Sequence, residues 1–247
     1  ACVGKTIGGG AYAFASKDGI ELLIEDDNFK QFLKNGEFLL IVGMDDITNI
    51  YAIETLEKLQ EKHEGRLFIK AYIHNSKGST FHPKYSWFAN GEGGNLILGS
   101  GNLTQKGLRQ NREAFTIEKC TKEEIECIQN KWNEWVQHSK AFLFDITEDI
   151  VKEYAKRNTN RMKSIVELQK QTKGKSEINH VFKYLELFNL QPKDMQKAYS
   201  ISKKEEESIS DPADMVIYDE DLDIDLPYWT IYLNKEVLIA EIPKSGT

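Results

Sequence analysis

Short apolar runs alternate with amphipathic stretches along the N-terminal part of the chain. Runs of β-branched and aliphatic residues, bounded by polar or glycine-containing turns, predict strands at residues 20–24, 38–43, 67–73, 81–88, 95–98 and 114–118. Apolar residues at three- to four-residue spacing predict helices at 48–63, 103–110, 121–138 and 147–171. Strands mixed with helices in this way predict an α/β or α+β sandwich.

Two of these helices carry capping signals at their N-termini. Thr48 can cap the helix at 48–63 through its hydroxyl group. Thr121 is followed three residues later by Glu124, which is the capping-box pattern for the helix at 121–138. The apolar residues of that helix recur at helical spacing and predict a buried stripe of Ile125, Ile128, Trp132, Trp135 and Val136.

The hydrophobic pattern weakens after residue 165. We expect a linker at 173–177, a short apolar helix at 181–190 and an acidic linker or loop at 202–225. Strands at 229–233 and 237–242 predict a hairpin around Asn234 and Lys235. We therefore divide the chain into a first domain at 1–165 and a mainly helical, acidic extension at 166–247.

Size and charge narrow the class of protein. The chain has 247 residues, of which 40% are hydrophobic and 29% charged, so it can build a core and is not a disordered chain. Its net charge of −7 argues against a protein that coats nucleic acid. The charge is segregated, however, because residues 201–226 carry −8 and residues 150–175 carry +6. A local contact with an anionic partner is therefore compatible with the sequence.

Nothing in the sequence indicates a membrane or secreted protein. No apolar run approaches the roughly 18 residues of a membrane span, and the first ten residues lack the basic and apolar regions of a signal peptide. The three cysteines, Cys2, Cys120 and Cys127, are too few and too scattered for a disulfide framework, and no Cys/His cluster has zinc spacing. We expect a cytoplasmic protein.

One segment, residues 81–115, gathers groups that can do chemistry. His82 and Lys84 are two residues apart on a predicted strand, so their side chains point to the same face. The strand at 95–98 opens through Gly99, Ser100, Gly101 and Asn102 into a predicted helix start, and backbone N–H groups there can bind an anion. Glu113 enters the next strand.

These residue types suit cleavage of a phosphodiester without a metal ion. A neutral imidazole at His82 can attack phosphorus and form a phosphohistidine. Lys84 and Asn102 can stabilise charge on the non-bridging oxygens, and Glu113 can fix the tautomer of the histidine. Each residue alone is a weak signal, and their order and spacing together carry the prediction.

His82 and Lys84, then Ser100 and Asn102, then Glu113, resemble the HxK/GSxN signature of the phospholipase D superfamily. The run GSGNLTQKGLRQNRE is similar to the nuclease branch, in particular to metal-independent type II restriction endonucleases of the BfiI and NgoFVII kind. One departure is the absence of an aspartate at residues 86–90, which argues against the lipid-hydrolysing branch.

The resemblance implies an α/β domain with a mixed β-sheet sandwiched by helices, and a DNA phosphodiesterase that needs no metal or other cofactor. His82 would be nucleophile or acid, Lys84 and Asn102 would bind phosphate, Ser100 would assist the phosphate or shape the turn, and Glu113 would orient the histidine. Three basic residues flank this motif and either contact the DNA backbone or lie on a solvated helix face: Lys106, Arg109 and Arg112.

The partners implied are double-stranded DNA and a second copy of the chain. The mechanism needs two histidines and the chain has a single copy of the complete HxK/GSxN signature, so we expect a homodimer with one shared active site. The extension at 166–247 would begin or connect to a DNA-recognition module. Two alternatives stay open: a lipid phosphodiesterase or phosphatidyltransferase, and a non-catalytic module that only binds phosphate.

Other candidate residues carry weaker signals. Asp45 and Asp46 follow a predicted strand, and we interpret them as a loop and helix-capping pair without metal partners. His74 lies near the motif, and we interpret it as a surface histidine. Gly4, Lys5 and Thr6 match the end of a phosphate-binding loop but lack the strand and the first glycine that such a loop needs.

Overall fold

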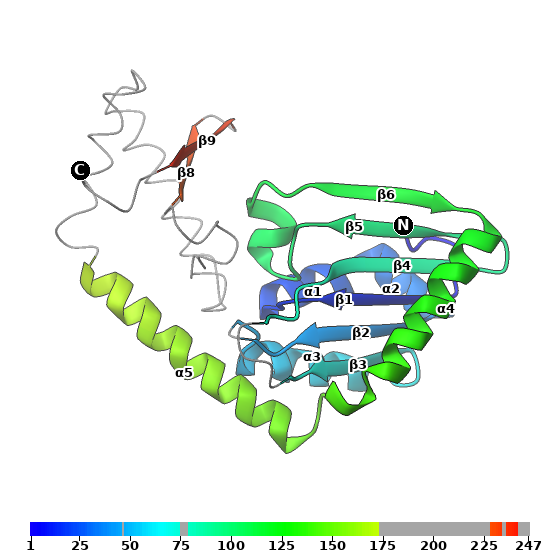
Figure 1. Cartoon of the computed structure of the whole chain (residues 1–247), viewed down its shortest axis with the longest axis horizontal. Coiled ribbons are helices and arrows are strands. Elements are labelled where there is room, and N and C mark those ends of the chain that lie inside the picture. Colours follow the sequence, from blue (N-terminus) through cyan, green and yellow to red (C-terminus); the bar gives the residue numbers. More distant parts are fainter. Residues whose placement is uncertain (46, 75–78, 173–227, 234–235, 242–247) are drawn as a thin grey trace. The chain divides into compact units, whose positions relative to one another are not determined.

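The computed structural model describes residues 1–45, 47–74, 79–172, 228–233 and 236–241 (Figure 1). The chain divides into two compact units, Ala1–Met162 and Lys163–Thr247. All of the predicted motif residues lie in the first unit, which contains a single large sheet.

Seven strands of the first unit form a mixed sheet in the order β6-β5-β4-β1-β2-β3-β7. The three strands β1 to β3 are parallel to one another, whereas β4, β5 and β6 follow on one side as an antiparallel meander and β7 pairs antiparallel with β3. Their bounds are β1 (Ile7–Tyr12), β2 (Glu37–Gly43), β3 (Leu67–Tyr72), β4 (Lys84–Asn90), β5 (Gly93–Gly99), β6 (Phe115–Cys120) and β7 (Leu143–Asp145).

Helices cover both faces of this sheet, with α4 on one face and α1 to α3 on the other (Figure 1). The α4 side is built on Trp132, which packs edge-on against Trp87 and Tyr85. The other side has a phenylalanine cluster, in which Phe38 of β2 lies 5.1 Å from Phe29 between ring centroids. The helices are α1 (Lys17–Ile24), α2 (Asp27–Leu33), α3 (Ile50–Lys62), α4 (Lys122–His138), α5 (Asp149–Thr172), a one-turn π-helix η1 (Lys106–Gln110) and a 3₁₀ turn η2 (Lys140–Phe142). The predicted α/β class, a mixed β-sheet sandwiched by helices, is confirmed.

The prediction of a strand at 20–24 is wrong, because these residues form the second half of α1. Ser16 caps this helix by accepting a hydrogen bond from the Gly19 N–H at 3.2 Å. Ile20 and Ile24 are four residues apart, which places both on the buried face of the helix. The β-propensity of the isoleucines is therefore outweighed by the cap and by tertiary packing.

Strand β1 has no counterpart among the predicted elements, because its sequence contains three consecutive glycines and so carries no hydrophobic alternation. It nevertheless lies between β4 and β2 in the sheet. A Cβ atom on Gly9 would lie 2.8 Å from Trp87 Nε1 and 2.9 Å from the Trp132 ring. Glycine is needed there because only a bare backbone lets the two indoles pack onto the strand. Helix α2 and strand β7 were also not predicted.

Several predicted boundaries shift by a few residues. The cap of α3 is Asn49, not Thr48, because the Asn49 side chain accepts from the N–H groups of the first turn. The Thr48 hydroxyl instead accepts from the Ala15 N–H at 3.1 Å. The predicted strand at 81–88 begins only at Lys84, and the predicted helix at 103–110 is shortened because Leu103 pairs with Ala15 as an isolated bridge.

Other elements match their predictions closely. The capping box of α4 is present, with reciprocal hydrogen bonds between Thr121 and Glu124 of 2.8 and 3.3 Å. The long basic helix is α5, and the predicted hairpin is present as the antiparallel pair β8 (Tyr228–Leu233) and β9 (Glu236–Glu241). The predictions for 173–177, 181–190 and 202–225 lie outside the described residues. None of the described helices is long and apolar enough to cross a bilayer.

Candidate active site

One edge of the sheet collects all the predicted catalytic residues. Strands β1, β2, β3 and β5 end at this edge, and the antiparallel strands β4 and β6 begin there (Figure 1). The register pairs Lys84 with Tyr12, and Gly99 with Phe115. The segments just before β4, just after β5 and just before β6 are therefore adjacent, which is the usual position of a ligand site in an α/β sheet.

His82 lies just before β4, and Lys84 is the first residue of that strand. Pairing with β1 continues one residue beyond the strand, because the Ala13 N–H donates to the Pro83 carbonyl at 2.7 Å. The imidazole of His82 is exposed and meets the buried Phe14 ring edge-on, with 6.0 Å between centroids. The Lys84 ammonium lies 2.7 Å from Nε2 and 3.0 Å from Nδ1 of His82. The two side chains are in contact, but only Lys84 lies on the strand that was predicted to carry both.

This contact has a chemical consequence for the imidazole. A lysine ammonium only donates hydrogen bonds, and a neutral imidazole has one nitrogen that accepts. Since Lys84 is within reach of both ring nitrogens of His82, it can donate to whichever nitrogen lacks the proton.

Ser100 and Glu113 lie at the two ends of the β5–β6 connection and are bound to each other. The Ser100 hydroxyl donates to the Glu113 carboxylate and accepts from the Ala114 N–H at 3.0 Å. Asn111 donates to the second carboxylate oxygen of Glu113 at 3.1 Å. These contacts hold the Glu113 carboxylate against Ser100. The role of Glu113 in orienting His82 stays a prediction.

Asn102 is pinned in a buried position at the same edge. Its side chain is 5% exposed, and the next residue, Leu103, bonds to the chain after β1 through Phe14 and Ser16 at 3.0 Å each. The side-chain oxygen of Asn102 is buried without a hydrogen-bond partner in the part of the chain that the structure describes. Leaving such a group unpaired costs about 1–3 kcal/mol, and a cost of this kind is typical of binding and catalytic sites.

The three predicted DNA-binding residues lie in the connection between β5 and β6. Lys106 and Arg109 belong to η1, and Arg112 immediately precedes Glu113. Both arginines are exposed. The structure thus places the basic residues on the same segment as Ser100, Asn102 and Glu113, and both interpretations of them are compatible with that position.

The sequence did not indicate that Asp45 and His74 contact each other beside the motif. The expectation of a surface histidine is wrong, because the His74 side chain is only 9% exposed and its Nε2 lies 3.2 Å from Asp45 Oδ2. The same carboxylate oxygen accepts the N–H of Phe81, the residue before His82, at 2.9 Å. Both residues follow buried parallel strands, and that position could have indicated that they meet at the edge.

Two tyrosines, Tyr12 and Tyr85, are further ionisable groups near this edge. Burial raises the pKa of Tyr85 to about 12, and burial also raises the pKa of Tyr12, against the effect of its hydrogen bond to Ser86. Both phenols are therefore protonated at neutral pH and are poor nucleophiles. The described residues contain no group of three or more His, Cys, Asp or Glu placed to hold a metal ion.

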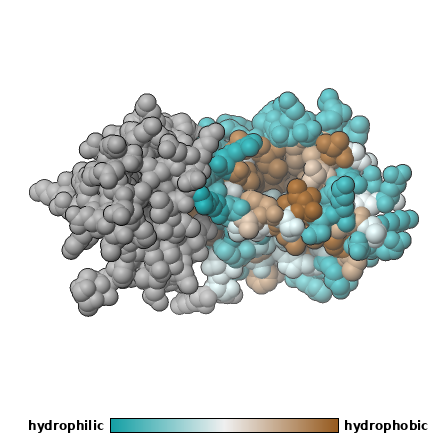
Figure 2. Space-filling view, turned by 90° about the horizontal axis from the view of Figure 1, so that it is seen from above, coloured by the Kyte–Doolittle hydropathy of each residue, from teal (hydrophilic) through white to brown (hydrophobic). Residues whose placement is uncertain are grey.

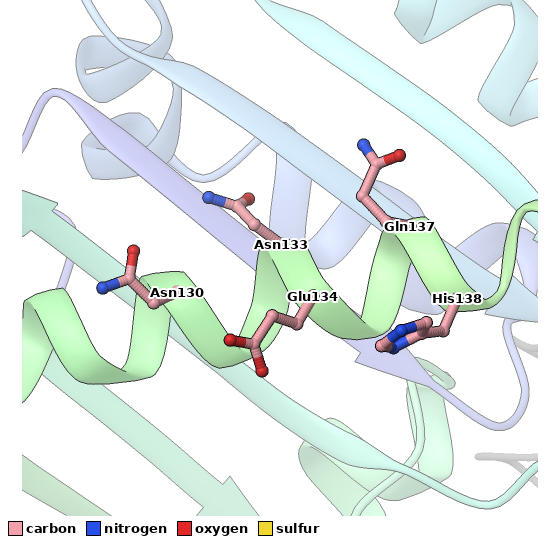
Figure 3. Close-up of a pocket in the computed structure, with 5 residues that line it drawn as sticks. All are labelled: Asn130, Asn133, Glu134, Gln137 and His138. Carbon is pink, nitrogen blue, oxygen red and sulfur yellow. The ribbon is translucent and has the colours of Figure 1, made fainter.

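A shallow depression on α4 is separate from this site. Figure 3 shows its lining side chains projecting from a single helix, without converging on a common point. Glu134 within it is paired with Lys131 at 2.8 Å. The lining residues of the depression are Asn130, Asn133, Glu134, Gln137 and His138.

The Gly4–Lys5–Thr6 segment is not arranged as a phosphate-binding loop, because the Lys5 side chain donates to the Gly93 carbonyl at 3.2 Å.

No protein-family model and no curated protein matches the chain. Solved structures that match part of it include NucT from Helicobacter pylori, with 14% identity, a TM-score of 0.39 and coverage of 57% of this chain and 82% of that one. A phospholipase D family member, Nuc from Salmonella typhimurium, matches with 13% identity, a TM-score of 0.38 and the same coverage. Phosphatidylserine synthase from Haemophilus influenzae Rd KW20 matches with 14% identity and a TM-score of 0.41 over 68% of this chain and 40% of that one.

Proposed function

We propose that the chain is a metal-independent phosphodiesterase that cleaves double-stranded DNA through a phosphohistidine at His82, and that it acts as a type II restriction endonuclease. The observation that carries the proposal is the contact of the Lys84 ammonium with both ring nitrogens of an exposed His82. This pair lies at the sheet edge that also holds Ser100, Asn102 and Glu113.

The proposed reaction proceeds in two displacements. The neutral imidazole of His82 attacks phosphorus, so that an N–P bond forms while one P–O ester bond breaks. The leaving oxygen takes a proton from a second imidazole, which thereby becomes neutral. Water then attacks phosphorus as the N–P bond breaks, and its proton goes to that second imidazole. The products are a phosphate monoester, an alcohol and the free enzyme.

The neighbouring groups supply the charge that such a reaction requires. Lys84 balances the negative charge on the non-bridging oxygens, and the amide of Asn102 donates to them after rotating its N–H group towards the site. Ser100 braces the turn through its bond to Glu113. With a fixed ammonium in place, the mechanism calls for no metal ion.

The second imidazole is proposed to come from a second copy of the chain. A two-fold axis near the edge would bring two His82 side chains face to face. Support comes from exposed apolar side chains on the strands beside the site, and Figure 2 shows apolar residues gathered between hydrophilic ones on the face seen from above. On β6, Phe115 is 50% and Ile117 is 61% exposed. Covering them would stabilise a homodimer.

Double-stranded DNA is proposed as the substrate because exposed basic side chains lie on the β5–β6 connection and on α5. Arg109 and Arg112 are exposed on the β5–β6 connection. On α5, Lys156, Arg157 and Arg161 are exposed, and the same helix is anchored beside the edge because Asn158 donates to the Met44 carbonyl at 2.9 Å. Such a rim suits a polyanion that passes across the site.

The test is digestion of supercoiled plasmid in excess EDTA by the full chain, with His82→Ala as the inactive variant. His138→Ala is the matched control, since His138 is also exposed but lies at the end of α4. We expect cleavage by wild type and by the control, and none by folded His82→Ala. Strict dependence on magnesium, or cleavage by His82→Ala, would contradict the mechanism. Release of a phospholipid headgroup without plasmid cleavage would favour the lipid phosphodiesterase. Binding of phosphate without any turnover would favour the non-catalytic phosphate-binding module.

A further inference from the structure

We propose that Asp45 is a positioning residue for His82, and that His74 holds the Asp45 carboxylate in place. This inference rests on the proposed function, because it assigns a role in the same reaction. Asp45 follows β2 and His74 follows β3, so two parallel strands deliver them to the edge at which His82 lies. Neither residue belongs to the motif that the sequence resembles.

The geometry centres on one oxygen atom. Asp45 Oδ2 accepts the Phe81 N–H at 2.9 Å and lies 3.2 Å from His74 Nε2, which donates to it. Hydrogen bonds to a charged acceptor are roughly twice as strong as bonds between neutral groups. The His74 side chain is 9% exposed and the Asp45 side chain 30%, so water competes little for these bonds.

His82 is thereby fixed from both sides along the chain. On the N-terminal side, the Phe81 N–H is bound to Asp45. On the C-terminal side, the Pro83 carbonyl accepts from Ala13 at 2.7 Å. Since the residues before and after His82 are both held, the direction in which its side chain leaves the backbone is set by these two anchors.

Asp45 is itself a rigid support. The residue before it, Met44, donates its N–H to the Tyr72 carbonyl at 3.1 Å and accepts from the Asn158 side chain at 2.9 Å. The Phe81 ring stacks on the Tyr72 ring with 4.1 Å between centroids. Because the Met44 backbone is bound to Tyr72 and to Asn158 of α5, the next residue, Asp45, is held beside the peptide that precedes His82.

A positioning role predicts a selective loss of turnover. The Asp45 carboxylate is bound to His74 and Phe81, and neither of these residues is assigned to phosphate binding. Substrate binding should therefore change little when the carboxylate is removed. A displacement of a reacting group by about 1 Å costs on the order of 100-fold in rate. We therefore expect Asp45→Ala to lower kcat about 100-fold and to leave KM within about twofold.

Asp45→Asn and Asp145→Ala are the matched variants. The Asn side chain keeps an oxygen that can accept from Phe81, so it should recover at least about tenfold of the lost kcat. Asp145 is another partly buried carboxylate, bound to Lys70 and to the Thr147 N–H, but it lies on β7, away from His82. Its removal should lower the melting temperature without lowering kcat. If Asp45→Ala does not fold, His74→Gln, which keeps a donor, and His74→Leu, which lacks one, replace it.

An assay independent of cleavage separates this inference from the proposed function. The imidazole NMR signal of His82 is assigned by its absence in His82→Asn, and we expect it to shift in Asp45→Ala while the signals of His63 and His138 stay unchanged. If wild type cleaves no DNA, the proposed function fails while this signal still decides the positioning role. A His82 signal and a kcat that both remain those of wild type in folded Asp45→Ala would overturn it.

Discussion

Gly107→Ala is a small change outside the motif that should damage the site through Asn102. A Cβ atom on Gly107 would lie 2.5 Å from the Asn102 carbonyl oxygen and 2.7 Å from its backbone nitrogen, whereas ordinary contact begins at 3.4 Å. The backbone of the β5–β6 connection must therefore open by about 0.9 Å. Since both neighbouring atoms are main-chain atoms, no flexible side chain can move aside instead.

The effect on activity should exceed the effect on stability. Overpacking costs about 1–3 kcal/mol, but alanine is favoured over glycine in a helical turn by about 1 kcal/mol. The net loss of folding free energy is thus about 0–2 kcal/mol. A shift of nearly 1 Å in a phosphate-binding group costs on the order of 100-fold in rate. We expect a folded protein whose plasmid cleavage is slower by about that factor.

Gly91→Ala is the control for this prediction. Gly91 lies in the turn between β4 and β5, and a Cβ atom there would meet nothing within 4 Å. The assay compares initial rates of plasmid nicking at saturating DNA with melting curves followed by circular dichroism. Equal cleavage rates for Gly107→Ala and Gly91→Ala would refute the reasoning, because either the close approach or the role of Asn102 would then be wrong.

Three further predictions test the partner, the footprint and the electrostatics. Mixed dimers of wild-type and His82→Ala chains should lose nearly all turnover, and nicked plasmid should precede linear plasmid; a monomer by sedimentation that cleaves at full rate would contradict the shared site. Charge reversal of Arg109, Arg112 and Arg157 together should make the negative slope of log K against log salt shallower by about 0.9 for each DNA phosphate that the variant no longer neutralises. An unchanged slope in a binding titration would exclude this footprint. Burial acts to raise the pKa of Asp145, but the hydrogen bonds it accepts hold that pKa below the usual value, so the carboxylate stabilises the fold above about pH 4 and this contribution is lost as the pH falls. Urea unfolding should therefore show Asp145→Asn to be less stable than wild type at pH 7, with a difference that shrinks towards pH 3.

The sequence predicted those elements whose signals are local. The capping box of Thr121 and Glu124 and the stripe of Ile125 and Trp132 depend only on spacing within one helix, and the structure confirms them. Strand β1 shows the limit of that approach. Gly9 makes room for the indoles of Trp87 and Trp132, which come from distant parts of the chain, so no local pattern in β1 indicates a strand.

The candidate site divides in the same way. The two-residue spacing of His82 and Lys84 predicted side chains on the same face, and the structure brings them into contact at the N-terminal end of β4. The partners of Glu113 depend on how the β5–β6 connection folds back on Ser100, which spacing alone does not give. The contact between Asp45, His74 and Phe81 depends on the order β4-β1-β2-β3 within the sheet.

Strand order therefore decides more of this site than the motif does. The strands β1, β2, β3 and β5 all end at one edge, and a different site residue follows each of them. Phe14 packs against the His82 imidazole, and Asp45 accepts the N–H of the residue before His82. His74 is bound to Asp45, and Asn102 is buried. Only the last of these belongs to the motif. A histidine and a lysine at the right spacing supply reactive groups, but the parallel strands β1, β2 and β3 supply the support that fixes the direction of the imidazole. For this reason substitutions after β2 and β3 are expected to affect turnover as strongly as substitutions within the β5–β6 connection.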